Sequence, residues 1–489
     1  MFCVVLRKRK RNLSVQTSTE LVSGPGSQFL RQEASEHITS LQRDQWITGD
    51  VRITLTFNMS KPTGQDMTTE SELKKLACHF NWELHKEGVD LNLLEVKFTE
   101  SLLVPGQHEK KFHGCSYNFL AFVKYLQGVS DKALQILEAD LEENTNHFVT
   151  FGNLACLNHL MGNDAAARSY LQRIEGTCRA LPNDSPHGLQ RAVLSEKAWT
   201  LLRFSKRHYS RAKDLFYDAL QKEPEDREWN TGYAFSLFRL EGLEIREDKR
   251  FPFEESPAVK QLKKALKIDP RNPMIHVYLG LKCYKNKRNS EAWEYMRKAI
   301  AMAPDDLCVV LQVAKFMKKE KAFDQALQVL KRMLQKVPNS SRLHHEIANN
   351  YRWKAVAMGE PHNPRLLHRC ILHMEEGIRF NPSFVYPQVE LAVRYAEMKN
   401  SEKAEKMFRA LFDLPDLRPA DLQACHRMYG DFHLYHLGAE ATAVKHYKLG
   451  MSLGNISTEF KPCHSRLLKV LDSKRTDIFG IHEFLDAFR

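Results

Sequence analysis

The sequence lacks several patterns that would place a protein in a known chemical class. Its ten cysteines include no pair spaced C-x-x-C, which argues against a disulfide framework and a zinc site. His368, Cys370 and His373 lie close together, but no second ligand cluster accompanies them, so we expect no metal ion. No apolar run approaches the ~20 residues of a membrane span. We therefore expect reduced thiols, no membrane partner and a cytoplasmic location.

Catalytic motifs are missing as well. The chain has no glycine-rich phosphate loop, no nucleophile elbow and no HExxH motif. We therefore expect neither an enzyme nor a bound cofactor.

The chain does carry an excess of positive charge. Its 72 Lys and Arg residues stand against 60 Asp and Glu residues, a net charge of +12 in 489 residues. Such an excess favours polyanionic partners such as nucleic acid. Since many basic proteins bind no polyanion, charge alone does not name the partner.

Residues 1–70 differ from the rest of the chain. Stretches such as STELVSGPGSQ are polar, contain Gly and Pro, and show no sustained periodicity, which predicts a disordered N-terminal extension. The apolar start precedes the basic run Arg7–Arg11, which is the wrong order for a secretory signal. That basic run is a nuclear localisation signal or, more often for so short a motif, a solvated tail.

The remainder of the chain repeats itself. In one unit Leu279 lies thirteen residues before Ala292, and Met296, Ala299 and Pro304 follow that alanine at +4, +7 and +12. A shift of 34 residues gives Val313, Ala326, Leu330, Met333 and Pro338. This is the period of the tetratricopeptide repeat, in which small residues let two antiparallel helices approach and proline ends the second helix.

The same thirteen-residue step recurs along the chain. It links Leu120 to Ala133, Leu154 to Ala167, Trp199 to Ala212, Leu391 to Ala404 and, less cleanly, Gly430 to Ala443. The sequence therefore predicts an all-α superhelix (an α-solenoid) of about eight to nine helical hairpins over residues 71–475, with a tail at 476–489. Functional residues are expected on the concave surface, which the first helix of each hairpin lines.

Particular stretches carry a more specific resemblance. LACHFNWELHKEGVDL, NFLAFVKYLQG, VTFGNLACLNHLMG, EKAWTLLRF, NTGYAFSLFRLE, LHHEIANNYRWKA and MYGDFHLYHLGAEATAVKHY occur in this order. Over about residues 72–450 the chain resembles the interferon-induced proteins with tetratricopeptide repeats. The resemblance implies an antiviral effector of innate immunity that holds the 5′ end of foreign single-stranded RNA, triphosphorylated or incompletely capped, in a basic tunnel and so blocks its translation.

The resemblance also implies site residues. Arg203 stands where the family usually has a phosphate-binding Lys, and Tyr209 and Arg239 match phosphate-contacting positions. Weaker matches are Trp199, which corresponds to a cap-stacking Trp, Lys315 and His345 on the RNA path, and Ser101, the nearest equivalent of a phosphate-contacting Gln. Each has a structural alternative: Trp199 and Tyr209 also suit packing, Arg203 and Lys315 a solvated helix face, and His345 a capping or packing role, while Arg239 could pair with Glu241 or Glu244.

Other positions depart from the family. Two residues that help to hold a metal ion in some members are Leu93 and Lys97 here. In the later part of the pocket, Cys308, Leu311 and Gln312 replace two tyrosines and an arginine, and Arg342, His345 and Glu346 replace a Phe-His-Gln trio. Glu346 should weaken contact with the RNA backbone unless Arg342 or Lys97 compensates.

Two further functions stay open at this stage. The altered later pocket favours a scaffold of the same family that binds relatives, as a homo- or hetero-oligomer, or translation factors, with little RNA affinity of its own. A peptide-binding co-chaperone array would need a carboxylate clamp of Lys and Asn residues, and no convincing set is present.

Overall fold

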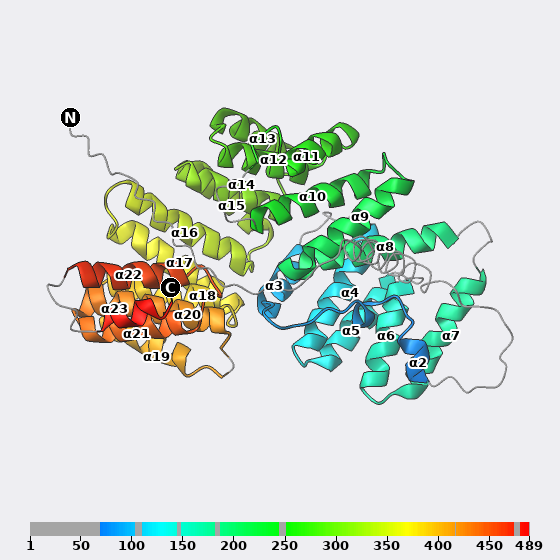
Figure 1. Cartoon of the computed structure of the whole chain (residues 1–489), viewed down its shortest axis with the longest axis horizontal. Helices are drawn as coiled ribbons and strands as arrows, with labels where there is room; N and C mark the ends of the chain where they lie inside the picture. The colour runs from blue at the N-terminus through cyan, green and yellow to red at the C-terminus, as the bar shows by residue number, and fades with distance from the viewer. Residues whose placement is uncertain are drawn as a thin grey trace, which may run out of the picture. The chain divides into compact units, whose positions relative to one another are not determined.

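The computed structural model describes residues 69–102, 110–143, 148–180, 186–243, 251–415, 417–473 and 480–488. The predicted extension 1–70 lies outside these ranges except for its last two residues. Residues 67–489 form one compact unit, whose helices are shown in Figure 1. In the described part of the chain the elements are α2 (Thr69–Leu73), η1 (His79–Asn81), α3 (Leu91–Leu102), α4 (Lys110–Leu126), α5 (Ser130–Glu143), α6 (Phe148–Leu160), α7 (Asp164–Ala180), α8 (Pro186–Phe204), η2 (Lys206–His208), α9 (Tyr209–Lys222), α10 (Arg227–Leu243), α11 (Pro257–Ile268), α12 (Pro273–Lys285), α13 (Asn289–Met302), α14 (Leu307–Lys319), α15 (Phe323–Lys336), α16 (Ser341–Ala357), α17 (Pro364–Phe380), α18 (Val385–Glu397), α19 (Ser401–Phe412), α20 (Pro419–Phe432), η4 (His433–Leu437), α21 (Glu440–Ser452), α22 (Phe460–Asp472) and α23 (Ile481–Asp486).

These helices pair into antiparallel hairpins, as the repeat predicts. The pairs are α4 with α5, α6 with α7, α8 with α9, α10 with α11, α12 with α13, α14 with α15, α16 with α17, α18 with α19 and α20 with α21. This makes nine hairpins in the described residues, and α22 and α23 follow them. The prediction of an all-α tetratricopeptide solenoid is confirmed.

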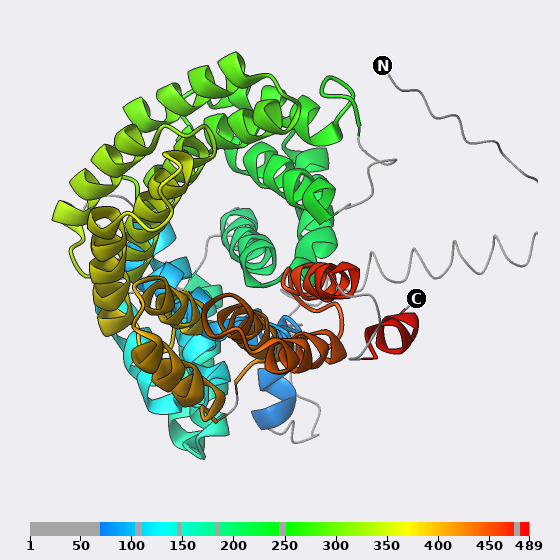
Figure 2. The same cartoon turned by 90° about the vertical axis from the view of Figure 1, so that its left-hand side faces the viewer.

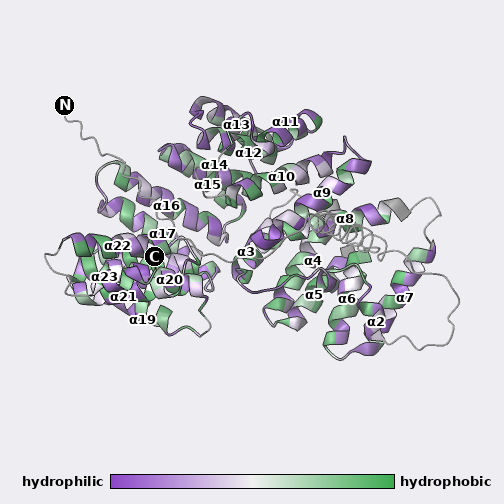
Figure 3. Ribbon diagram, viewed as in Figure 1, coloured by the Kyte–Doolittle hydropathy of each residue, from purple (hydrophilic) through white to green (hydrophobic). Residues whose placement is uncertain are grey.

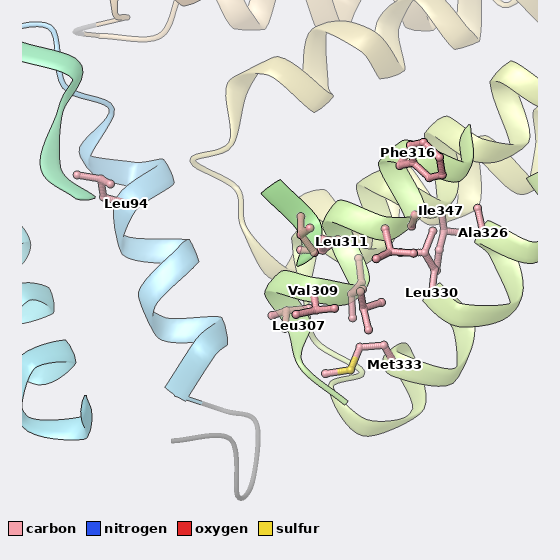
Figure 4. Close-up of a cluster of buried hydrophobic side chains, with 14 of the residues drawn as sticks. Leu94, Leu307, Val309, Leu311, Phe316, Ala326, Leu330, Met333 and Ile347 are labelled. Atoms are coloured by element: carbon pink, nitrogen blue, oxygen red, sulfur yellow. The ribbon is translucent and has the colours of Figure 1, made fainter. Parts of the chain in front are cut away.

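The repeat landmarks form the core. Leu279, Ala292, Met296 and Ala299 are fully buried, and so are their counterparts 34 residues later. Figure 4 shows one such cluster, in which Leu330 and Met333 of α15 pack with α14 and α16. In Figure 3 apolar and polar stretches alternate along the helices, as expected for helices that bury one face and expose the other.

Local signals set the helix ends. Ser256, Asn272 and Asn363 each accept a hydrogen bond from a backbone N–H in the first turn of the next helix. Proline occupies the first helical position after each of these caps, where its missing N–H does no harm. The start of a hairpin helix is therefore encoded locally.

The turn within a hairpin also repeats. Gly128 and Gly162, 34 residues apart, have φ values of 83° and 84°, and Lys287 and Lys321, again 34 apart, have φ values of 60° and 62°. A left-handed residue at this point ends the first helix and redirects the chain. Lysine adopts this conformation at some energetic cost, so the tight turn is a requirement of the repeat rather than a preference of the residue.

Helix α3 precedes the repeats and contacts hairpins that come much later in the chain. The Glu100 carboxylate accepts hydrogen bonds from Ser340 Oγ at 2.8 Å and Ser341 Oγ at 2.9 Å at the start of α16. Asp90, just before α3, forms an ion pair of 2.8 Å with Arg418. Within this unit the hairpins follow one another around a curve (Figure 2). Through Glu100, α3 contacts the start of α16 in the later part of that curve.

Candidate functional site

Five basic side chains from five helices converge around α3. They are Lys97 of α3, Arg203 of α8, Arg239 of α10, Lys315 of α14 and Arg342 of α16. The charges of Arg342, Lys315 and Arg239 all disfavour protonation of Lys97, and Arg239 disfavours the charge on Arg203. The mutual influence of these residues shows that the curved array brings them into one region.

Lys97 and Lys315 have the same unusual environment. Both side chains are exposed to solvent, yet burial by the surrounding protein is the main cause that lowers the pKa of each ammonium, that of Lys97 to about 8. Contact with solvent combined with enclosure on most sides describes a side chain that faces an interior space rather than an outer surface. Neither forms a salt bridge with any described residue.

Arg203 lies over aromatic rings. Its guanidinium carbon is 5.3 Å from the centroid of the Trp199 ring and 5.9 Å from that of Phe98. Burial lowers the pKa of Arg203, and no carboxylate in the described part of the chain pairs with it. The alternative of a solvated helix face therefore does not describe this residue.

Arg239 and Tyr209 come together as the resemblance implies. The guanidinium of Arg239 lies 5.4 Å from the centroid of the Tyr209 ring and donates a hydrogen bond to the Leu202 carbonyl. Glu241 does not pair with Arg239, because it forms an ion pair with Lys282 and accepts hydrogen bonds from Ser256. Glu244 lies outside the described residues. The alternative in which Arg239 pairs with Glu241 is therefore wrong, and Arg239 forms no salt bridge with a described residue.

Trp199 combines packing with a place beside the cations. Its ring meets Phe216 edge-on at 5.2 Å and Phe235 at 6.1 Å, and Nε1 donates to Glu228 Oε1 at 3.0 Å. Packing therefore fixes the orientation of the ring under Arg203. Ser101 donates to the Lys97 carbonyl of its own helix at 2.6 Å, so its hydroxyl is occupied.

The later part of the predicted site is largely paired within the chain. His345 Nε2 is 2.6 Å from Glu390 Oε2, and Lys318 Nζ is 2.6 Å from Glu346 Oε1. The Arg342 backbone N–H donates to Glu100 Oε1 at 3.2 Å, and its guanidinium is 3.8 Å from Glu100 Oε2. These carboxylates already offset most of the positive charge on this side.

The three residues that replace the family's second aromatic cluster do not form a new one. Cys308 is exposed and Gln312 is half-buried, whereas Leu311 is 2% exposed and belongs to the core (Figure 4). Leu311 therefore does not face the interior space, in contrast to what its place in the predicted pocket suggests. Its helix α14 contributes Lys315 instead.

Sequence reasoning missed two features of this region. The sequence indicates Lys97 as a departure from the family that could compensate for Glu346, but not that it lies among the basic residues of four later helices. Phe98 is not among the predicted residues, and it supplies the second ring beside Arg203. The signal for both was present, since a basic and an aromatic residue stand side by side in the helix before the first repeat.

The described residues contain neither a cluster of metal ligands nor a helix that could span a membrane. Within the described ranges no group of three or more His, Cys, Asp or Glu side chains has an arrangement that could hold a metal ion. In the same ranges no helix combines the length and apolar character needed to cross a bilayer.

Comparison with known proteins identifies relatives over most of the chain. A family model described as tetratricopeptide repeat matches residues 284–348. The human antiviral innate immune response effector IFIT1 is 30% identical over 405 residues, which cover 78% of this chain and 83% of that protein. Human IFIT1 homolog B is 30% identical over 82% of this chain and 87% of its own length.

Solved structures agree with this relationship. A human IFIT1 dimer with PPP-AAAA matches with a TM-score of 0.62 at 28% identity, covering 83% of this chain and 91% of that one. A human IFIT1 dimer with m7Gppp-AAAA gives 0.63 at 27% identity, with 86% and 98% covered. The repeat phase, the fold and these relatives together place the chain: it belongs to the family of interferon-induced proteins with tetratricopeptide repeats.

Proposed function

We propose that this protein is a non-catalytic antiviral effector that captures the 5′ end of foreign single-stranded RNA in the interior of its superhelix. The RNA carries a 5′-triphosphate or an incompletely methylated cap. Sequestration of that end is sufficient to block translation, so no bond needs to be broken. Human IFIT1, which is similar over most of this chain, has been solved with both kinds of RNA end.

The observation that carries this proposal is the set of cations without carboxylate partners. Lys97, Arg203, Arg239 and Lys315 form no salt bridge with a described residue, and burial and mutual repulsion disfavour several of these charges. A protein gains little stability from such an arrangement. A polyphosphate would relieve the repulsion and release counterions, which makes the cluster a binding site rather than a structural one.

The aromatic residues supply the second part of a nucleotide site. The Trp199 ring contacts the Arg203 guanidinium, and the Tyr209 ring contacts the Arg239 guanidinium, through cation–π interactions. Such support orients a guanidinium toward a phosphate and reduces the entropy lost on binding.

Charge substitution tests this assignment. Arg239→Glu and Arg203→Gln should each lower affinity for 5′-triphosphate RNA at least tenfold, because a hydrogen bond to a charged group contributes about 1.5–3 kcal/mol. Arg227→Glu is the matched control, since Arg227 is exposed at the opposite end of α10. Wild-type affinity in both site variants would refute the assignment, and thermal melting of each variant would check that it folds.

A second function has its own support. Glu100, Glu346 and Glu390 neutralise the later half of the predicted pocket from within the chain. This pairing favours a scaffold that binds relatives or translation factors and has little RNA affinity of its own. RNA binding that is absent at every salt concentration, together with retained binding to a family member, would select this function.

We further propose that the chain self-associates through its C-terminal helices. Leu449 and Leu468 of α21 and α22 are 41% and 37% exposed, and Ile456 between these helices is 46% exposed. Apolar side chains exposed on neighbouring helices are typical of a protein interface. Leu468→Glu should convert a dimer into a monomer in light scattering after size-exclusion chromatography. A wild-type monomer at tens of micromolar would contradict self-association.

A further inference from the structure

A second basic site lies on the other side of helix α16 from the interior cluster. A cavity of about 260 Å³ is lined by residues from α15, α16 and α17; they are Asp324, Leu327, Gln328, Lys331, Tyr351, Lys354, Leu366 and Arg369. Nine residues separate Tyr351 from Arg342, which is about 2.5 turns of an α-helix. The two side chains therefore leave α16 in opposite directions, and the cavity is separate from the proposed RNA path.

The cavity is electropositive. Three cations and one carboxylate line it, which gives a net charge of +2. Asp324 forms an ion pair of 2.5 Å with Lys354. Lys331 and Arg369 form no salt bridge with any residue that the structure describes, so two charges remain for a ligand.

Tyr351 lies between these two cations. Lys331 Nζ is 5.5 Å and Arg369 Cζ is 5.7 Å from the centroid of its ring. The residue is only 3% exposed; its hydroxyl makes no hydrogen bond to the described part of the chain and is not among the buried polar atoms that lack a partner, so the hydroxyl is in contact with solvent. An anion in the cavity would accept a hydrogen bond from this free hydroxyl.

We propose that this cavity binds a phosphate monoester carried by a protein segment, such as a phosphoserine side chain. Arginine supplies a fork of donors, lysine a point charge and tyrosine an O–H, which together match the oxygens of a dianionic phosphate. The volume lies below the roughly 300–1,000 Å³ typical of drug-sized ligands. It therefore suits a phosphorylated side chain, and Leu327 and Leu366 offer apolar contact to its neighbours.

The lining argues against nucleic acid as the ligand. Tyr351 is the one aromatic residue among the lining side chains. Its ring is already in contact with Lys331, Arg369 and the ring of His373, whose centroid is 6.0 Å away. Base stacking needs an open aromatic face, and none is available here.

Calorimetry on the full chain tests the proposal. The probes are an acetylated and amidated peptide Ala-Ala-phosphoserine-Leu-Ala, the same peptide with serine, and inorganic phosphate. The phosphopeptide should bind, and the serine peptide should not. Lys331→Gln and Arg369→Gln should each weaken phosphopeptide binding about tenfold or more, and Tyr351→Phe, which keeps the ring, about fivefold.

Arg332→Gln is the matched control. Arg332 follows Lys331 directly, its side chain is 61% exposed, and it does not line the cavity. An equal loss of affinity in this variant would reduce the effect to general charge and overturn the site. Wild-type affinity in the double variant Lys331→Gln/Arg369→Gln, or no binding of the phosphopeptide at all, would overturn it too.

Two further results separate the possible sources of phosphate. If inorganic phosphate bound as tightly as the phosphopeptide, the assignment to a protein segment would be wrong. If Arg369→Gln also lost affinity for 5′-triphosphate RNA, the cavity would belong to the RNA path, against the proposal. We expect Arg369→Gln to leave RNA binding unchanged, whether or not the proposed function of the interior cluster is correct.

Discussion

The pKa of Lys97 shows how a single residue is affected by the basic cluster around α3. Burial and the charges of Arg342, Lys315 and Arg239 lower the pKa of its ammonium to about 8. The charged form is therefore lost as the pH rises through 8, more than two units below the usual value for lysine. A bound phosphate favours the protonated form, so affinity for the phosphate should depend on pH in this range.

We expect the affinity for 5′-triphosphate RNA to fall between pH 7 and pH 9, by up to about tenfold per unit above pH 8. Lys97→Arg should flatten this profile, because arginine stays charged throughout the range. Fluorescence anisotropy at a series of pH values measures the effect. Identical profiles for the wild type and the arginine variant would exclude Lys97 from the phosphate site.

At the residue scale, the role of the candidate residues in RNA binding stays a prediction, but the structure shows which of them come together. The family resemblance pointed to Arg203, Tyr209 and Arg239, and the structure places Arg239 over Tyr209 and within electrostatic reach of Arg203. The sequence could not predict that a candidate residue pairs with a side chain far along the chain. The ion pair of His345 with Glu390, 45 residues away, has no local signal in the sequence.

At the scale of helices and turns, the sequence predicted the structure best. The 34-residue phase fixed the hairpins because the small and apolar landmarks are the residues that two packed helices require. The contact of α3 with α16 was not predictable, because Glu100 and Ser340 are separated by 240 residues. No periodicity within either helix indicates that the other one lies beside it.

This contact makes a prediction about the elements that it joins. Glu100→Gln removes the charge that two serine hydroxyls and one backbone N–H stabilise, so it should reduce stability by about 2 kcal/mol. Hydrogen exchange should speed up in α3 and in the first turn of α16. Glu95→Gln on the same helix is the control, because the partners of Glu95 in the described residues are Lys124 of α4 and Gln127 just after it, and its side chain is 28% exposed. Equal exchange in both variants would show that Glu100 does not hold α3 to α16.

The hairpin α20–α21 should be sensitive to acid. His426 Nδ1 and His446 Nδ1 are 2.9 Å apart, and burial lowers the pKa of each imidazole to about 4. Since both pKa values lie below the unfolded value of about 6.5, their contribution to stability is complete above pH 6.5 and is lost as the pH falls toward 4. At pH 5 the free energy of unfolding should be lower than at pH 7 by about 1–2 kcal/mol for each imidazole.

Hydrogen exchange in α21 at pH 7 and pH 5, corrected for the intrinsic rate, measures this loss. His446→Phe should reduce the difference, since it keeps a ring against Tyr429, whose centroid is 4.7 Å from that of His446. His433 and Glu405 also face this pair, so some pH dependence should remain. A difference as large as that of the wild type would mean that His446 is not its source.

At the scale of the whole molecule, the protein has a net charge of +12, and two groups of its cations lie in separate places. One group of cations surrounds α3, and a smaller group lines the cavity between α15 and α17. Overall charge predicted a polyanionic partner but not where it binds, because location depends on the curvature that brings five helices together.

The most direct test compares matched RNAs with 5′-triphosphate and 5′-hydroxyl ends, each bound to the wild-type protein at 50 mM and 200 mM salt. If the protein neutralises about three phosphate charges, it should bind the triphosphate RNA more tightly than the hydroxyl RNA. It also predicts that the advantage shrinks roughly 20-fold between the two salt concentrations. Equal affinities for the two RNAs at both concentrations would contradict recognition of the 5′ end.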